Sequence, residues 1–86
     1  MPTISVFFGI IIRMFYRDHN PPNFHAEHQG QHAKVDFDGK LLDGEIDSRT
    51  AKNLIRKWAR LHKPELDKNW EHMRQRQGFI RIEPLQ

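Results

Sequence analysis

The chain contains no cysteine, and its 86 residues include only five prolines and five glycines. Without cysteine neither a disulfide framework nor a thiolate zinc site can form, which favours a reducing compartment. The apolar run from Val6 to Ile12 is far shorter than the roughly 20 residues of a membrane span. No basic segment or cleavage site accompanies that run, so a signal peptide is not expected. We therefore expect a cytoplasmic protein with no membrane partner.

The length and charge of the chain set further limits. Eighty-six residues correspond to a single domain, residues 1–86, with a modest hydrophobic core. The formal net charge is +3 at neutral pH with the histidines uncharged. A mildly basic protein can contact a polyanion, but the distribution of its charge matters more than the total.

The first half of the sequence has the alternation and turn residues of β-strands. Gly9 separates two β-branched and aromatic runs, residues 3–8 and 10–16, and is predicted to form a bend or bulge. A two-residue turn at Gln29-Gly30 would set Phe24 opposite Val35, so that the apolar side chains of a hairpin share one face. Residues 42–46 are predicted to continue the sheet.

The second half has helical spacing. A first helix is predicted to begin at Asp47 or Ser48 and to end before Pro64, and a second to run from Pro64 to a glycine cap at Gly78. Residues 79–82 read as a short final strand. The sequence thus predicts an α+β fold: an antiparallel sheet of four to five strands, with two C-terminal helices on one face and that final strand. Six aromatic residues are predicted to lie in the core: Phe7, Phe8, Phe15, Phe24, Trp58 and Trp70.

Histidines and a carboxylate gather on the outer face of the predicted hairpin. The register places His25, Glu27 and His32 there, within a few residues of one another. Two imidazoles and one carboxylate can hold Zn²⁺ or Fe²⁺ with open coordination positions. Solvated histidines on a hairpin would give the same pattern, so the sequence leaves the zinc or iron site open.

The same region offers acid–base chemistry without a metal. Cleavage of RNA by its own 2′-hydroxyl needs a base, an acid and a cation, and histidine suits the first two roles. His19 and His25 flank the rigid Pro21-Pro22 loop and are the candidate catalytic residues, with Arg17 and Lys34 as nearby cations. The alternative is that the polar side chains of this loop only satisfy its backbone.

A row of cations follows one side of the first predicted helix. Its members, called the basic stripe below, are Arg49, Lys52, Arg56, Arg60 and Lys63. On a helical wheel they lie opposite the apolar residues, and they could follow a phosphate backbone. A solvated helix face or an acidic protein partner would explain the same pattern.

Several segments carry a resemblance to a known family. They are Pro-Thr-Ile-Ser-Val-Phe-Phe-Gly at residues 2–9, Asp-His-Asn-Pro-Pro-Asn-Phe-His at 18–25, and Trp-Ala-Arg-Leu-His at 58–62. These segments resemble the small bacterial proteins of domain-of-unknown-function family 4160. Members are often encoded beside another small protein, as in a toxin–antitoxin pair, so the resemblance implies such a partner. Asn23 stands where the family commonly carries a third histidine, so a cluster that needs that imidazole would be incomplete here.

These observations favour a regulatory or toxin–antitoxin-like module that contacts RNA or DNA through the basic stripe, with the histidine loop near the same ligand. One alternative is a ribonuclease-like hydrolase, metal-independent or metal-assisted, that uses His19 and His25. Another is a protein-interaction module without nucleic acid, whose exposed sheet edges pair with a second chain. The sequence does not decide whether the protein is an enzyme.

Overall fold

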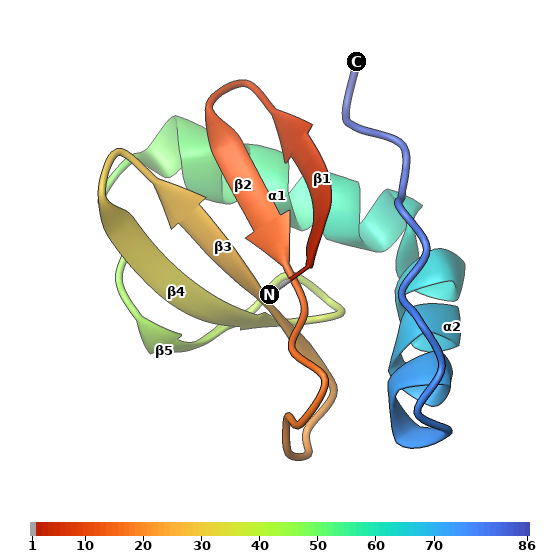
Figure 1. Ribbon diagram of the computed structural model, residues 1–86. Coiled ribbons are helices and arrows are strands. Elements are labelled where there is room, and N and C mark those ends of the chain that lie inside the picture. The colour runs from red at the N-terminus through yellow and green to blue at the C-terminus, as the bar shows by residue number, and fades with distance from the viewer. Residues whose placement is uncertain (1) are drawn as a thin grey trace.

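The first half of the chain forms a five-stranded antiparallel sheet. A computed structural model describes residues 2–86. The strands are β1 (Thr3–Phe7), β2 (Ile10–Arg13), β3 (Asn23–His28), β4 (Gln31–Asp36) and β5 (Leu41–Gly44). They are ordered β1-β2-β3-β4-β5 in the sheet, so each strand pairs with its neighbours in the sequence (Figure 1). This arrangement confirms the predicted antiparallel sheet.

Two tight turns set the pairing of these strands. At Gln29 and Gly30 both φ angles are positive, 49° and 79°, as a two-residue hairpin turn with the twist of the sheet requires. The resulting register pairs Phe24 with Val35, as predicted. Phe8 and Gly9 form a second turn of the same kind, with φ angles of 49° and 76°. Gly9 is therefore part of a hairpin turn rather than a bend within a strand.

The inner face of the sheet packs on the first helix, α1 (Arg49–Leu61). Ser48 caps this helix by accepting a hydrogen bond from the N–H of Ala51 at 3.1 Å. Trp58 is fully buried at the centre of the contact, with its ring centroid 5.5 Å from that of Phe24. In Figure 1, α1 runs behind the sheet and crosses its strands. Within residues 2–86, no helix covers the opposite face of the sheet (Figure 1).

The second helix, α2 (Lys63–Arg74), stands beside the sheet and buries Trp70 against Phe37. It ends without the predicted glycine cap. Arg76 takes the left-handed conformation, with φ +59°, while the N–H groups of Arg76 and Gln77 bond carbonyls of the last turn. Gly78 lies beyond this motif. Neither helix of residues 2–86 has the length or apolar character to cross a membrane.

The C-terminal segment after α2 is extended but does not form the predicted strand. Its backbone bonds the sheet through the Ile82 N–H, which donates to the Ile4 carbonyl in β1 at 2.8 Å, and the side chains of Ile82 and Leu85 are buried in the core. A side chain of α2 takes the place of a strand partner. The buried amide of Asn69 donates to the Ile80 carbonyl and accepts from the Ile80 N–H, both at 2.8 Å. These bonds fix the segment along α2, where Figure 1 shows it.

The predicted aromatic core is correct in part. Phe7, Phe24, Trp58 and Trp70 are buried in it. Phe8 is not, because its place in the turn leaves its side chain 61% exposed. Phe15 is partly buried on the outer face, where its ring meets that of His25 edge-on at a centroid distance of 4.2 Å.

Candidate functional site

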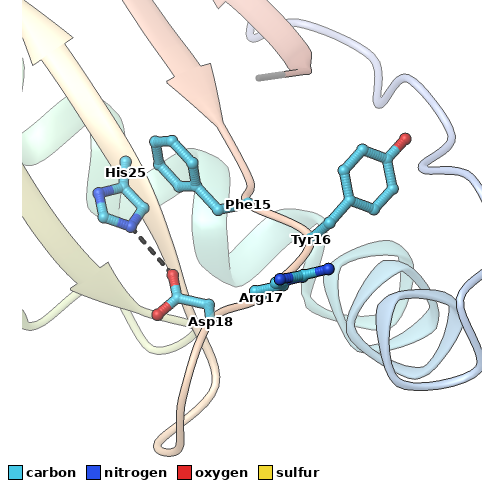
Figure 2. A pocket seen from close by; sticks show the side chains of 5 residues that line it. All are labelled: Phe15, Tyr16, Arg17, Asp18 and His25. Carbon is cyan, nitrogen blue, oxygen red and sulfur yellow. Dashed lines mark hydrogen bonds and ion pairs between the residues drawn. The ribbon is translucent and has the colours of Figure 1, made fainter.

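An aspartate and two histidines form a hydrogen-bonded chain on the outer face of the sheet. Asp18 Oδ2 lies 3.0 Å from His25 Nε2, and His25 Nδ1 lies 3.0 Å from His32 Nε2. Figure 2 shows the first of these contacts. We call these three residues the imidazole relay. It lies on the face turned away from α1, because its histidines alternate along their strands with the buried residues of the core.

The local sequence explains how these three side chains meet. The hairpin of β3 and β4 pairs Glu27 with His32 and His25 with Lys34, so that the two histidines are diagonal neighbours on one face. The loop between β2 and β3 turns back through a cis Asn20–Pro21 bond. That turn is held by Asn23, whose side-chain amide donates to the His19 and Pro21 carbonyls at 3.2 and 2.8 Å. Asp18 is thereby returned to the start of β3.

The electrostatics of the relay favour a neutral imidazole beside a charged carboxylate. Desolvation lowers the pKa of His25 below its ordinary value, and it outweighs the hydrogen bond and charge of Asp18, which raise that pKa. Burial alone would raise the pKa of Asp18. Hydrogen bonds from His25 and the His19 N–H, with the charge of Lys34, hold it below its ordinary value. At pH 7 the relay therefore contains Asp18 as carboxylate and His25 uncharged.

This charge state determines the direction of the hydrogen bonds. A carboxylate only accepts, so the network assigns the proton of His25 to Nε2 and leaves its Nδ1 as an acceptor. Nε2 of His32 then donates to that Nδ1. In a neutral His32, the lone pair of Nδ1 remains for solvent or a ligand. The relay thus orients an exposed imidazole as a base through a second imidazole and a carboxylate.

A cleft of about 470 Å³ adjoins the relay. Phe15, Tyr16 and Arg17 line it together with Asp18 and His25. In Figure 2, Tyr16 and Arg17 extend from the same loop to the other side of Phe15, away from His25. The relay is therefore next to space that a small ligand or a segment of a polymer can occupy.

The predicted metal ligands lie close together but engage other groups. His25 and His32 bond each other, and the Glu27 carboxylate forms an ion pair of 3.0 Å with Arg13 on β2. Among residues 2–86, no three histidine or acidic side chains are arranged to hold a metal ion. The structure gives no geometric support for a zinc or iron site formed by these three residues.

The two residues of the predicted catalytic pair, His19 and His25, each bond the carboxylate of Asp18, His19 through its backbone N–H and His25 through its ring. His19 lies on the α2 side of the loop, where it lines a small cleft with Trp70 and Met73. No hydrogen bond within residues 2–86 joins it to His25, whose imidazole partner is His32. The sequence did not identify Asp18 as the carboxylate that bonds His25. The available signal was a carboxylate seven residues before a strand histidine, across a rigid turn.

Four members of the basic stripe lie on the exposed face of α1, on the other side of the sheet from the imidazole relay, while Lys63 is the first residue of α2. Lys63 does not belong to its free charges, because its Nζ pairs with Asp38 at 3.0 Å. No carboxylate within residues 2–86 lies at ion-pair distance from the other four members, which are Arg49, Lys52, Arg56 and Arg60. The sheet separates these four cations from the two histidines of the relay, whereas the histidine loop reaches Lys63, which lines a small cleft together with Pro21 and Pro22. That the loop and the stripe contact one ligand stays a prediction.

The family of the chain follows from a comparison with family models. The model described as a domain of unknown function, DUF4160, matches residues 9–71. The chain belongs to this family, as the resemblance of its histidine loop and first helix indicated. The match covers β2 to β5, α1 and most of α2, and so includes the relay and the basic stripe. No curated protein and no solved structure matches the chain.

Proposed function

We propose that the protein is a small regulatory module, of the toxin–antitoxin-like kind, that binds RNA or DNA through the exposed face of α1. The observation that carries the proposal is the run of four exposed or half-exposed cations on this face with no acidic partner within residues 2–86. Nucleic acid supplies the missing negative charge, and its binding releases condensed counterions.

The size of the stripe fits this ligand. From Arg49 to Arg60 the helix rises about 16 Å, at 1.5 Å per residue. A duplex carries a phosphate about every 3.4 Å along each strand, so the stripe can contact several phosphates. Such contacts position a backbone and do not read bases. We therefore expect binding with little sequence preference from α1 alone, and a protein partner encoded nearby would add specificity.

Binding is tested by fluorescence anisotropy with a labelled 20-base-pair duplex and a single-stranded RNA. We expect the Arg56→Glu, Arg60→Glu double variant to lose most of its affinity for both. The matched control is Lys68→Glu with Arg81→Glu, which changes the net charge equally at exposed positions outside α1. If both double variants weaken binding equally, the total charge matters and the stripe does not.

The imidazole relay favours a second candidate function, in which the protein is a metal-independent, ribonuclease-like hydrolase. His32 Nδ1 would take the 2′-hydroxyl proton as that oxygen attacks the neighbouring phosphorus, and the 5′-oxygen would leave with a proton from solvent. Asp18, acting through His25, would stabilise the positive charge that His32 gains. Lys34, whose Nζ lies 3.6 Å from Asp18 Oδ1, supplies a nearby cation.

Cleavage of a fluorescent RNA oligonucleotide in excess chelator tests the second function. His32→Ala and His25→Ala should each lower the rate about 100-fold or more, because they remove the base and the group that orients it. His28→Ala is the matched control, since His28 lies at the end of β3 outside the relay. Activity equal to that of the parent in both relay variants would exclude this chemistry.

A further inference from the structure

A second cleft, lined by arginines, lies between the β2–β3 loop and the end of α2. It has a volume of about 580 Å³, and we call it the arginine cleft. Its lining consists of Tyr16, Arg17, Met73, Arg74 and Arg76. The volume is within the range of about 300–1,000 Å³ that is typical of small-molecule sites. It shares Tyr16 and Arg17 with the cleft beside the imidazole relay, so the two spaces adjoin.

The charges of the arginine cleft are largely uncompensated. Within residues 2–86, no carboxylate lies at ion-pair distance from Arg17 or Arg76. Arg74 contacts Glu71 at 3.7 Å, but both side chains are more than half exposed, and such pairs contribute little. Three guanidinium groups around one cleft repel one another unless an anion lies between them. Guanidinium binds phosphate with two parallel hydrogen bonds, which makes phosphate the anion of best fit.

The backbone at Arg76 gives a second, independent indication. Its φ of +59° costs an L-residue about 1–2 kcal/mol relative to the right-handed region. Glycine is the usual residue at this position after a helix, because it has no such cost. Residues held in such strained conformations cluster at ligand-binding sites, which supports a role of the Arg76 side chain in the cleft.

Tyr16 adds an aromatic surface to the arginines. Its side chain is about half exposed, and Phe79 from the C-terminal segment stacks on it at a centroid distance of 4.6 Å and an angle of 15°. The ring borders both clefts, and Figure 2 shows it next to Arg17. Bases stack on such rings without regard to sequence. If a nucleotide placed its phosphate on the arginines, its base would therefore be able to reach the ring of Tyr16.

We propose that the arginine cleft binds the phosphate group of a nucleotide, with the base against Tyr16 in the adjoining cleft. The ligand is a phosphomonoester attached to a planar base, which is either a free mononucleotide or the phosphorylated end of an RNA strand. The site uses no residue of the basic stripe. Nucleotide binding in the arginine cleft is therefore tested independently of nucleic-acid binding by α1.

The test is calorimetric titration of the intact protein with AMP, inorganic phosphate and adenosine. We expect AMP to bind more tightly than either of the other two, because it alone presents both groups. Arg17→Gln should weaken AMP about tenfold or more, since it removes a charge-assisted contact. Arg81→Gln, an exposed arginine outside the cleft, should leave AMP binding unchanged.

Arg76→Gly separates a binding role from a structural one. Glycine relieves the positive φ, so this variant should be at least as stable as the parent while binding AMP about tenfold more weakly. A 5′-phosphorylated trinucleotide that binds more tightly than AMP would identify an RNA end as the ligand, and the reverse order would identify the free nucleotide. Equal affinities for AMP and adenosine, or unchanged AMP binding in both arginine variants, would overturn the proposal.

Discussion

Replacing Asp18 with alanine should destabilise the protein by an amount that the structure lets us work out. Its two carboxylate oxygens accept hydrogen bonds from His25 at 3.0 Å and from the His19 N–H at 2.9 Å. The Asp18 side chain is only 10% exposed and that of His25 17% exposed, so water replaces their bond poorly. A hydrogen bond to a charged group contributes about 1.5–3 kcal/mol, whereas the exposed His19 N–H can bond water instead. We expect a loss of about 2 kcal/mol at pH 7.

Urea denaturation followed by tryptophan fluorescence measures this change. With a slope near 1 kcal/mol/M, typical of a small domain, the midpoint should fall by about 2 M. Glu45→Ala serves as the control, because it removes an exposed carboxylate that makes no side-chain bond within residues 2–86. It should shift the free energy of unfolding by less than about 0.5 kcal/mol.

The same experiment has a defined pH dependence. The folded-state pKa of Asp18 lies below its unfolded value of about 3.9, so the contribution of its charge is complete above that pH and is lost as pH falls through the folded pKa. The pKa of His25 is also lowered, so its contribution is complete above about pH 6.5 and is lost on acidification. The difference between the parent and Asp18→Ala should therefore shrink below about pH 4. A difference that is absent at pH 7, or that persists unchanged into acid, would refute the reasoning.

Three further substitutions test the fold that holds the site. Asn69→Ala removes both side-chain bonds to Ile80, so it should cost about 2–3 kcal/mol and speed amide hydrogen exchange in the C-terminal segment; unchanged exchange would contradict this role. Phe8→Asn should raise the free energy of unfolding by about 0.5–1 kcal/mol, because asparagine tolerates the positive φ of the turn, and a lower melting temperature would count against that turn. Gly44→Ala should destabilise by more than about 2 kcal/mol, because its Cβ would lie 2.3 Å from the His32 carbonyl oxygen at a φ of +79°; wild-type stability would show that β5 is placed differently.

The hairpin of β3 and β4 was predictable because its signals are local. Apolar alternation and the Gln29-Gly30 turn both specify one register, and a slip by one residue would expose Phe24 and Val35. The N-cap at Ser48 and the core position of Trp58 follow from equally short patterns. The candidate metal set His25, Glu27 and His32 was correctly placed on one face for the same reason.

The remaining features depend on contacts distant in sequence or on competition between groups. Asp18 and His25 are seven residues apart, and their bond forms only because the loop between them folds back on itself. No local propensity predicts that conformation of the loop. The predicted final strand does not form, because the side chain of Asn69 bonds both the N–H and the carbonyl of Ile80. Asn69 is eleven residues away from Ile80 in the sequence. The pairing of Lys63 with Asp38 spans 25 residues, so the sequence alone overestimated the free charge of the stripe.

The salt dependence of nucleic-acid affinity tests the central claim most directly. Contact between four free cations of α1 and single-stranded RNA should give a slope of about −3 in a plot of log K against log salt concentration. Raising the salt from 50 to 200 mM should then weaken binding about 50-fold, and the Arg56→Glu, Arg60→Glu variant should lose most of this dependence. An affinity that does not change with salt, or a slope that is the same in that variant, would contradict the account.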